Sequence, residues 1–78
     1  MRLKWIHDAL GSIDLMVDDL LAGWVIQDED GSFYLMTHNF SRQAWTNTHH
    51  PERYNTLRQA MRALRTHAIV QRLGGDHE

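Results

Sequence analysis

An acidic turn between two runs of aromatic and β-branched residues constrains the fold of this chain more than any other feature. Residues 24–27 (WVIQ) and 33–37 (FYLMT) flank the turn at residues 28–32 (DEDGS). Aromatic and β-branched side chains favour strands, and an Asp-Gly pair is typical of a tight turn with a positive φ at the glycine. The sequence therefore predicts a β-hairpin over residues 24–37.

The segment before the hairpin has the spacing of a helix. Its apolar residues recur at i, i+3, i+4 and i+7, at Ile13, Met16, Val17 and Leu20. This pattern predicts a helix over residues 13–21 with one buried face, capped by Ser12 and ended by Gly23. For residues 3–10 the apolar spacing favours a short helix, although the alternation of Leu3 and Trp5 leaves a strand open.

A polar stretch separates the hairpin from a second amphipathic segment. Residues 38–51 predict an extended loop, with a short helical turn at residues 41–45. Pro51 suits the start of the next helix, and Asn55 or Thr56 would cap a later start. The stripe that the helix buries has the spacing i, i+3, i+7, i+10 and i+14, at Tyr54, Leu57, Met61, Leu64 and Ala68.

The end of the chain fits either more helix or a last strand. A helix that continues to Gly74 would turn Ile69 and Val70 away from the apolar stripe, whereas residues 68–73 alternate as a strand does. We therefore expect an α+β fold with the order αββαβ: an N-terminal helix, a hairpin, a long helix and a short final strand. No linker divides the chain, so residues 1–78 are expected to form a single domain.

Charge is unevenly divided along the chain, although the formal net charge is only −2. Residues 1–39 carry two cations against seven acids, a formal charge of −5, and residues 40–78 carry six arginines against three acids, a formal charge of +3. Such a dipole stabilises the fold from within, joins two copies of the chain, or attracts a charged partner.

Three arginines of the long helix form one ridge. Arg58, Arg62 and Arg65 are spaced i, i+4, i+7, about 90° from the apolar stripe. Their stems can cover the margin of the core, and their guanidinium groups suit carboxylates or phosphates. Asp18 and Asp19 would lie near the C-terminal end of their predicted helix, where the helix dipole disfavours acids. We therefore expect the ridge to compensate them, within one chain or across a dimer contact.

Aromatic residues add to this predicted surface. The residues that we expect to bind a partner are Arg42, Arg58, Arg62 and Arg65, with Trp45 and Tyr34 as aromatic neighbours and Arg72 joining them if the chain end lies near. Strand alternation also sends Trp24 and Ile26 to one face of the sheet and Val25 to the other. In a two-layer fold the far face of the sheet is open unless a partner or a second copy covers it. Exposed aromatic patches bordered by arginine are typical of protein interfaces.

Catalysis, cofactors and metal ions are not expected. Ser12, Ser32 and Ser41 each fit a cap or a turn, and the chain has no glycine-rich phosphate loop. His49 and His50 diverge if they lie in a strand, and the chain has no cysteine, so a zinc site is not expected. No apolar run is long enough to span a membrane, and the cytoplasm is the expected compartment.

These observations favour a small non-catalytic module that binds another protein or regulates it, and a homodimer is the expected oligomer. The alternative is a nucleic-acid-associated regulator that uses the arginine helix, although the negative net charge disfavours it. A hairpin, a loop with Trp45 and a Tyr54-x-Thr56-x-x-x-Ala60 helix resemble the layout of small proteins of bacteria and their mobile elements. The resemblance implies such an origin and assigns no residue a role.

Overall fold

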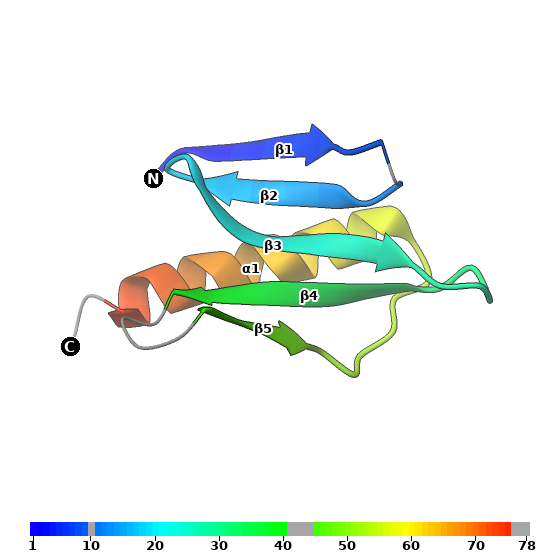
Figure 1. Ribbon diagram of the computed structural model, residues 1–78. Helices are drawn as coiled ribbons and strands as arrows, with labels where there is room; N and C mark the ends of the chain where they lie inside the picture. Colours follow the sequence, from blue (N-terminus) through cyan, green and yellow to red (C-terminus); the bar gives the residue numbers. More distant parts are fainter. Residues whose placement is uncertain (10, 41–44, 76–78) are drawn as a thin grey trace.

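Five antiparallel strands followed by one helix make up the fold (Figure 1). The computed structural model describes residues 1–9, 11–40 and 45–75. The elements are β1 (Leu3–His7), β2 (Ile13–Val17), β3 (Leu20–Gln27), β4 (Phe33–Phe40), β5 (Trp45–His49) and α1 (Leu57–Gly75). The strands form one sheet in the order β1-β2-β3-β4-β5, so every strand pairs with its neighbours in sequence. The predicted αββαβ order is therefore wrong.

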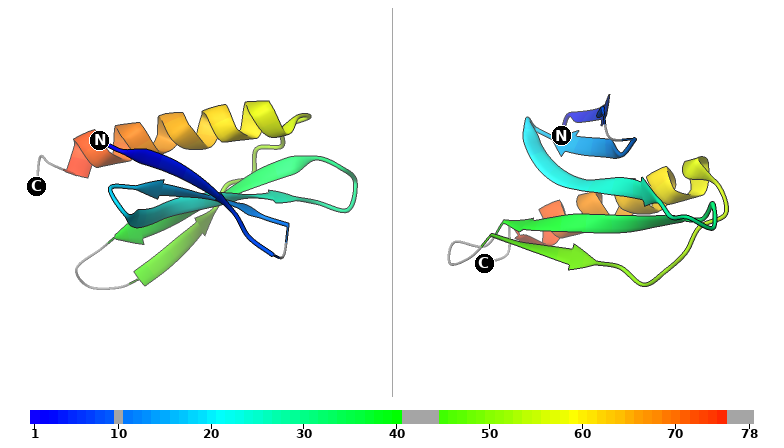
Figure 2. Two further views of the ribbon diagram at one scale, coloured as in Figure 1. Left: turned by 90° about the horizontal axis from the view of Figure 1, so that it is seen from above. Right: turned by 45° about the vertical axis from the view of Figure 1, so that its right-hand side comes forward.

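The helix α1 lies along one face of the twisted sheet and leaves the other face uncovered (Figure 2). The core between them joins every second residue of the central strands to one stripe of α1. Its buried members are Leu15, Val17, Val25, Leu35, Ala60, Leu64 and Ala68. No helix in the described part of the chain is long and apolar enough to cross a membrane.

The helix that we predicted over residues 13–21 is replaced by β2, a turn and the start of β3. Ile13, Leu15 and Val17 are buried, whereas Asp14 and Met16 between them are half-buried. The apolar residues of this segment thus fit both helical spacing and strand alternation. The strand forms because β2 pairs through its backbone with a strand on each side. Residues 3–7 form the edge strand β1, which pairs with β2 along its length. Ser12 does not cap a helix but donates its hydroxyl to Asp8 in the β1–β2 turn.

Asp18 and Asp19 form the turn between β2 and β3. Their φ angles are 51° and 68°, as in a two-residue hairpin turn with both central residues left-handed. The Arg2 amide donates to Asp18 Oδ1 at 2.8 Å, and the Arg2 guanidinium lies 3.4 Å from the Asp19 carboxylate. The expectation that the arginine ridge compensates these acids within one chain is therefore wrong.

The hairpin predicted over residues 24–37 is confirmed. Val25 pairs with Leu35, and Trp24 pairs with Met36. The amide of Asp28 donates to the Ser32 carbonyl at 2.8 Å, and Gly31 has the expected positive φ, 88°.

Residues 38–51 are not a loop throughout. The strand β4 continues to Phe40, and β5 pairs with it along residues 45–49. The predicted helical turn at residues 41–45 falls mostly outside the described residues, and Trp45 is the first residue of β5.

The helix α1 begins at the later of the predicted starts and runs beyond the predicted end. The backbone amide of Gln59 donates to Thr56 Oγ1 at 3.1 Å, and the backbone amide of Thr56 donates to Gln59 Oε1 at 3.3 Å. This reciprocal pair is a capping box. The final strand predicted at residues 68–73 is wrong, because α1 continues to Gly75. Val70 simply remains 64% exposed.

Candidate functional site on the uncovered face of the sheet

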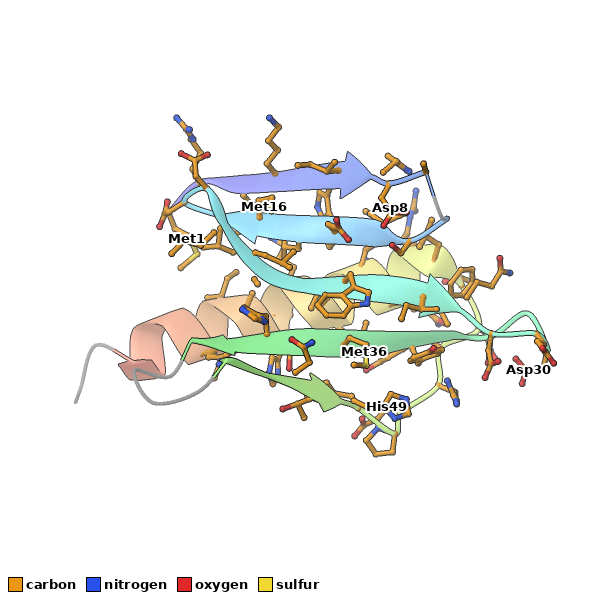
Figure 3. The ribbon with its side chains drawn as sticks, viewed as in Figure 1. Met1, Asp8, Met16, Asp30, Met36 and His49 are labelled. Carbon is orange, nitrogen blue, oxygen red and sulfur yellow. The ribbon has the colours of Figure 1, made fainter. Side chains whose placement is uncertain are left out.

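A row of side chains crosses all five strands on the face that α1 leaves uncovered. The backbone register pairs Ile6 with Asp14, Asp14 with Trp24, Trp24 with Met36, and Met36 with His49. On β2, β3 and β4 both neighbours of each row residue along the strand are buried against α1, so alternation points the row away from α1. Figure 3 looks onto this face, with Met36 on β4 and His49 on β5.

Further apolar side chains widen the row into a patch. Ile26 and Tyr34 pair across β3 and β4 on one side of the row, and Met16 lies on β2 on its other side. All three are half-buried by their neighbours on the sheet, as are Trp24 and Met36. We call these residues, together with the row, the open face. Because α1 is the single helix among the described residues, no second layer covers this patch.

Cationic and aromatic groups meet at the β4–β5 side of the open face. The Arg53 guanidinium lies over the Tyr34 ring, 4.5 Å from its centroid, and also 3.3 Å from the Asp28 carboxylate. The Tyr34 and His49 rings pack edge to face with centroids 5.0 Å apart. These contacts hold Arg53 at the rim of the apolar patch.

Acidic groups lie on the opposite half of the open face. Asp14 stands on β2 between Ile6 and Trp24 in the row. Burial first, and then the nearby Asp8 carboxylate, raise the pKa of Asp14 above its ordinary value. The open face therefore presents an acid, Asp14, on one side of β3 and a guanidinium group, Arg53, on the other side, where Arg53 is also paired with Asp28.

The arginine ridge lies on α1, away from the open face. Arg58, Arg62 and Arg65 are exposed, and none of them has an acidic partner among the described residues. Tyr34 lies on the uncovered side of the sheet, so the predicted surface is divided between two sides of the molecule. Arg42 and the side chains of Trp45 and Arg72, which also belonged to that prediction, lie outside the described residues.

A broad depression of about 710 Å³ runs between α1 and residues 53–55, and Arg62 and His67 contribute to its lining. His67 packs edge to face on His50, with ring centroids 4.7 Å apart, and His50 Nε2 lies 2.8 Å from Thr37 Oγ1. Burial, followed by the charge of His50, lowers the pKa of His67. The described residues contain no group of three or more His, Cys, Asp or Glu side chains that could hold a metal ion.

Sequence reasoning found part of the open face and missed the rest. Trp24 and Ile26 share a face, as their alternation in the predicted hairpin indicates. Asp14 and Met16 were missed because residues 13–21 were assigned to a helix. The signal that could have placed them is the apolar alternation of Ile13, Leu15 and Val17.

Comparisons with protein families, with curated proteins and with solved structures give no match.

Proposed function

We propose that the protein is a small non-catalytic binding module that docks another protein surface onto its open face. The observation that carries this proposal is the in-register row from Ile6 to His49, which spans all five strands on the face that α1 leaves uncovered. Apolar sheet faces of soluble domains are normally covered, because their burial contributes about 25 cal/mol per Å².

The shape and chemistry of the open face suit a protein partner. The row is broad and lies on a sheet, whereas small-molecule sites are concave. An apolar centre with Trp24 and Met36, bordered by Arg53 and His49, has the composition of a protein interface with an aromatic core and a charged rim. We place the module in the cytoplasm, since a chain without cysteine fits a reducing compartment.

A site-specific photo-crosslinker tests this use of the open face. The crosslinking amino acid replaces Met36 in one variant and Val70 in a control variant, and both are expressed in cells and irradiated. Val70 is the better exposed of the two and lies on α1. We expect a discrete protein adduct from position 36 and none from position 70. Absence of an adduct at position 36, or equal labelling at both positions, contradicts the proposal.

The exposed arginine ridge favours a second candidate function, attachment to nucleic acid. Arg58, Arg62 and Arg65 lie within two turns of α1 and have no acidic partner among the described residues, so they are free to contact phosphates. About three phosphate contacts give binding that weakens by a factor of about 10 to 20 for each threefold rise in salt. Retention on heparin or a DNA shift with that salt dependence supports this function, and indifference to both contradicts it.

A further inference from the structure

An acid and a guanidinium group lie on opposite sides of the middle strand of the open face, and this placement points to what covers it. Asp14 lies on β2, one strand from the centre of the sheet, whereas His49 lies on β5 and Arg53 stands over Tyr34 of β4. A half-turn about the middle strand brings a group on one side of a surface against a group on the other side, so Asp14 of each copy approaches Arg53 of the other copy.

We propose that the occupant of the open face is a second copy of this chain, packed face to face about a two-fold axis parallel to the strands near β3. This inference rests on the proposed function, because it names the partner of the same face. In such a dimer two sheets form the centre and the two α1 helices lie outside. Aligned sheets of this kind pack about 10 Å apart.

The register fixes which residues meet under this axis. The strand β2 lies over β4 of the second copy, and β1 lies over β5. Asp14 then faces Met36 of the second copy, within side-chain reach of its His49 and Arg53. Trp24 lies on the axis and meets its own counterpart, the central position at which aromatic residues contribute most to binding.

The other face-to-face arrangement is disfavoured by the same charges. A two-fold axis along the row, across the strands, places each residue of the row over its own counterpart. Asp14 would then lie against Asp14 of the second copy. Like charges in direct contact oppose association. Under the proposed axis Lys4 lies opposite Asn47 of the second copy, so it meets no like charge.

The size of the open face predicts a weak dimer. Five strands at about 4.8 Å, each contributing about five residues at about 3.3 Å, cover about 24 by 17 Å, or about 400 Å² per copy. The total of about 800 Å² is half of a standard interface of about 1,600 Å². We therefore expect a dissociation constant of about 10–100 μM rather than a permanent dimer.

Sedimentation equilibrium of four charge variants tests the dimer and its axis. Asp14→Lys places a cation within side-chain reach of Arg53 of the second copy, and His49→Glu places an acid within side-chain reach of Asp14 of the second copy. Each change occurs twice in the dimer, so each should raise the dissociation constant about tenfold. The double variant Asp14→Lys/His49→Glu restores opposite charges and should return to the wild-type value. Arg65→Glu on exposed α1 controls for net charge and should change nothing.

Each outcome decides a specific point. A protein that stays monomeric to about 1 mM overturns the second copy as occupant, and a dimer that ignores both single variants overturns the open face as its interface. Weakening by both single variants without restoration in the double variant overturns the axis. The proposed function is tested separately: an adduct from position 36 with the mass of a different protein sustains the binding module and rejects the homodimer.

Discussion

Gly23 of β3 lies against Leu64 of α1 without room for a side chain. A Cβ atom on Gly23 would stand 2.9 Å from Leu64 Cδ1 and 2.5 Å from the Met36 carbonyl oxygen. Both Gly23 and Leu64 are buried, so this contact sets how closely α1 approaches the centre of the sheet. The distance to the Met36 carbonyl is the decisive one, because a backbone atom of the neighbouring strand cannot move away alone.

Gly23→Ala should therefore destabilise the protein by about 1–3 kcal/mol, the range for overpacking of a core. Urea denaturation measures the free energy of unfolding. Gly31→Ala is a matched control, since Gly31 has free space for a Cβ but a φ of 88° that L-residues disfavour. It should cost about 1 kcal/mol from conformation alone. A Gly23→Ala protein as stable as the wild type contradicts the close packing of Gly23 against the Met36 carbonyl and Leu64.

Thr56→Ala should lower the free energy of unfolding by about 1 kcal/mol, because it removes the hydroxyl that accepts from the Gln59 amide. Thr56→Ser keeps an acceptor at the same place and should stay within about 0.5 kcal/mol of the wild type. Denaturation midpoints of the two variants compare them directly. An equal loss in both variants argues against the capping box as the start of α1.

Asp19→Gly should stabilise the protein by about 0.5–1 kcal/mol, because glycine adopts the φ of 68° without steric cost. The ion pair with Arg2 that it removes is about 80% exposed on both sides and offsets little of this gain. Asp18→Gly is the comparison, since it also removes the oxygen that accepts from the Arg2 amide. Asp18→Gly should gain less. Thermal unfolding of both variants distinguishes the two contributions.

The protein should lose stability as the pH falls below about 6.5, the ordinary pKa of histidine. The native state lowers the pKa of His67, so as the pH falls the unfolded chain takes up the proton first. Proton binding stabilises the unfolded chain and so lowers the free energy of unfolding. His67→Gln should make the urea midpoint depend less on pH between pH 7.5 and 5.5. His50→Gln removes only the smaller cause and should reduce this dependence partly. An unchanged slope in His67→Gln would falsify this assignment.

A local signal made the hairpin predictable, because the Asp-Gly turn acts within a few residues. The start of α1 was left open between Pro51 and a later cap at Asn55 or Thr56, and the Thr56–Gln59 capping box, another local signal, decides for the later start. The segment around Met16 failed because its apolar residues fit both periods, and pairing with β1 and β3 decides between them. The strand β5 was missed because the polar residues 46–49 of an edge strand lack an apolar alternation.

Residues of the open face could be predicted only where the strand that carries them was recognised from the sequence. Trp24 and Ile26 were placed on one face because their strand was recognised. Placing Asp14 on the open face requires the pairing register of β2, which no local sequence signal determines. The same holds for the acids of the β2–β3 turn, whose pairing with Arg2 depends on β1 lying beside β2.

The last prediction separates the arginine ridge from the open face. Arg58→Glu/Arg62→Glu changes two exposed residues of α1 that have no acidic partner in the described part of the chain, so the free energy of unfolding should change by no more than about 0.5 kcal/mol. The dimer proposed above should keep its dissociation constant, because the ridge lies on the far side of the sheet. Heparin retention, if the ridge binds phosphates, should be lost. A weakened dimer with unchanged stability would show that α1 takes part in self-association and would contradict an interface confined to the open face.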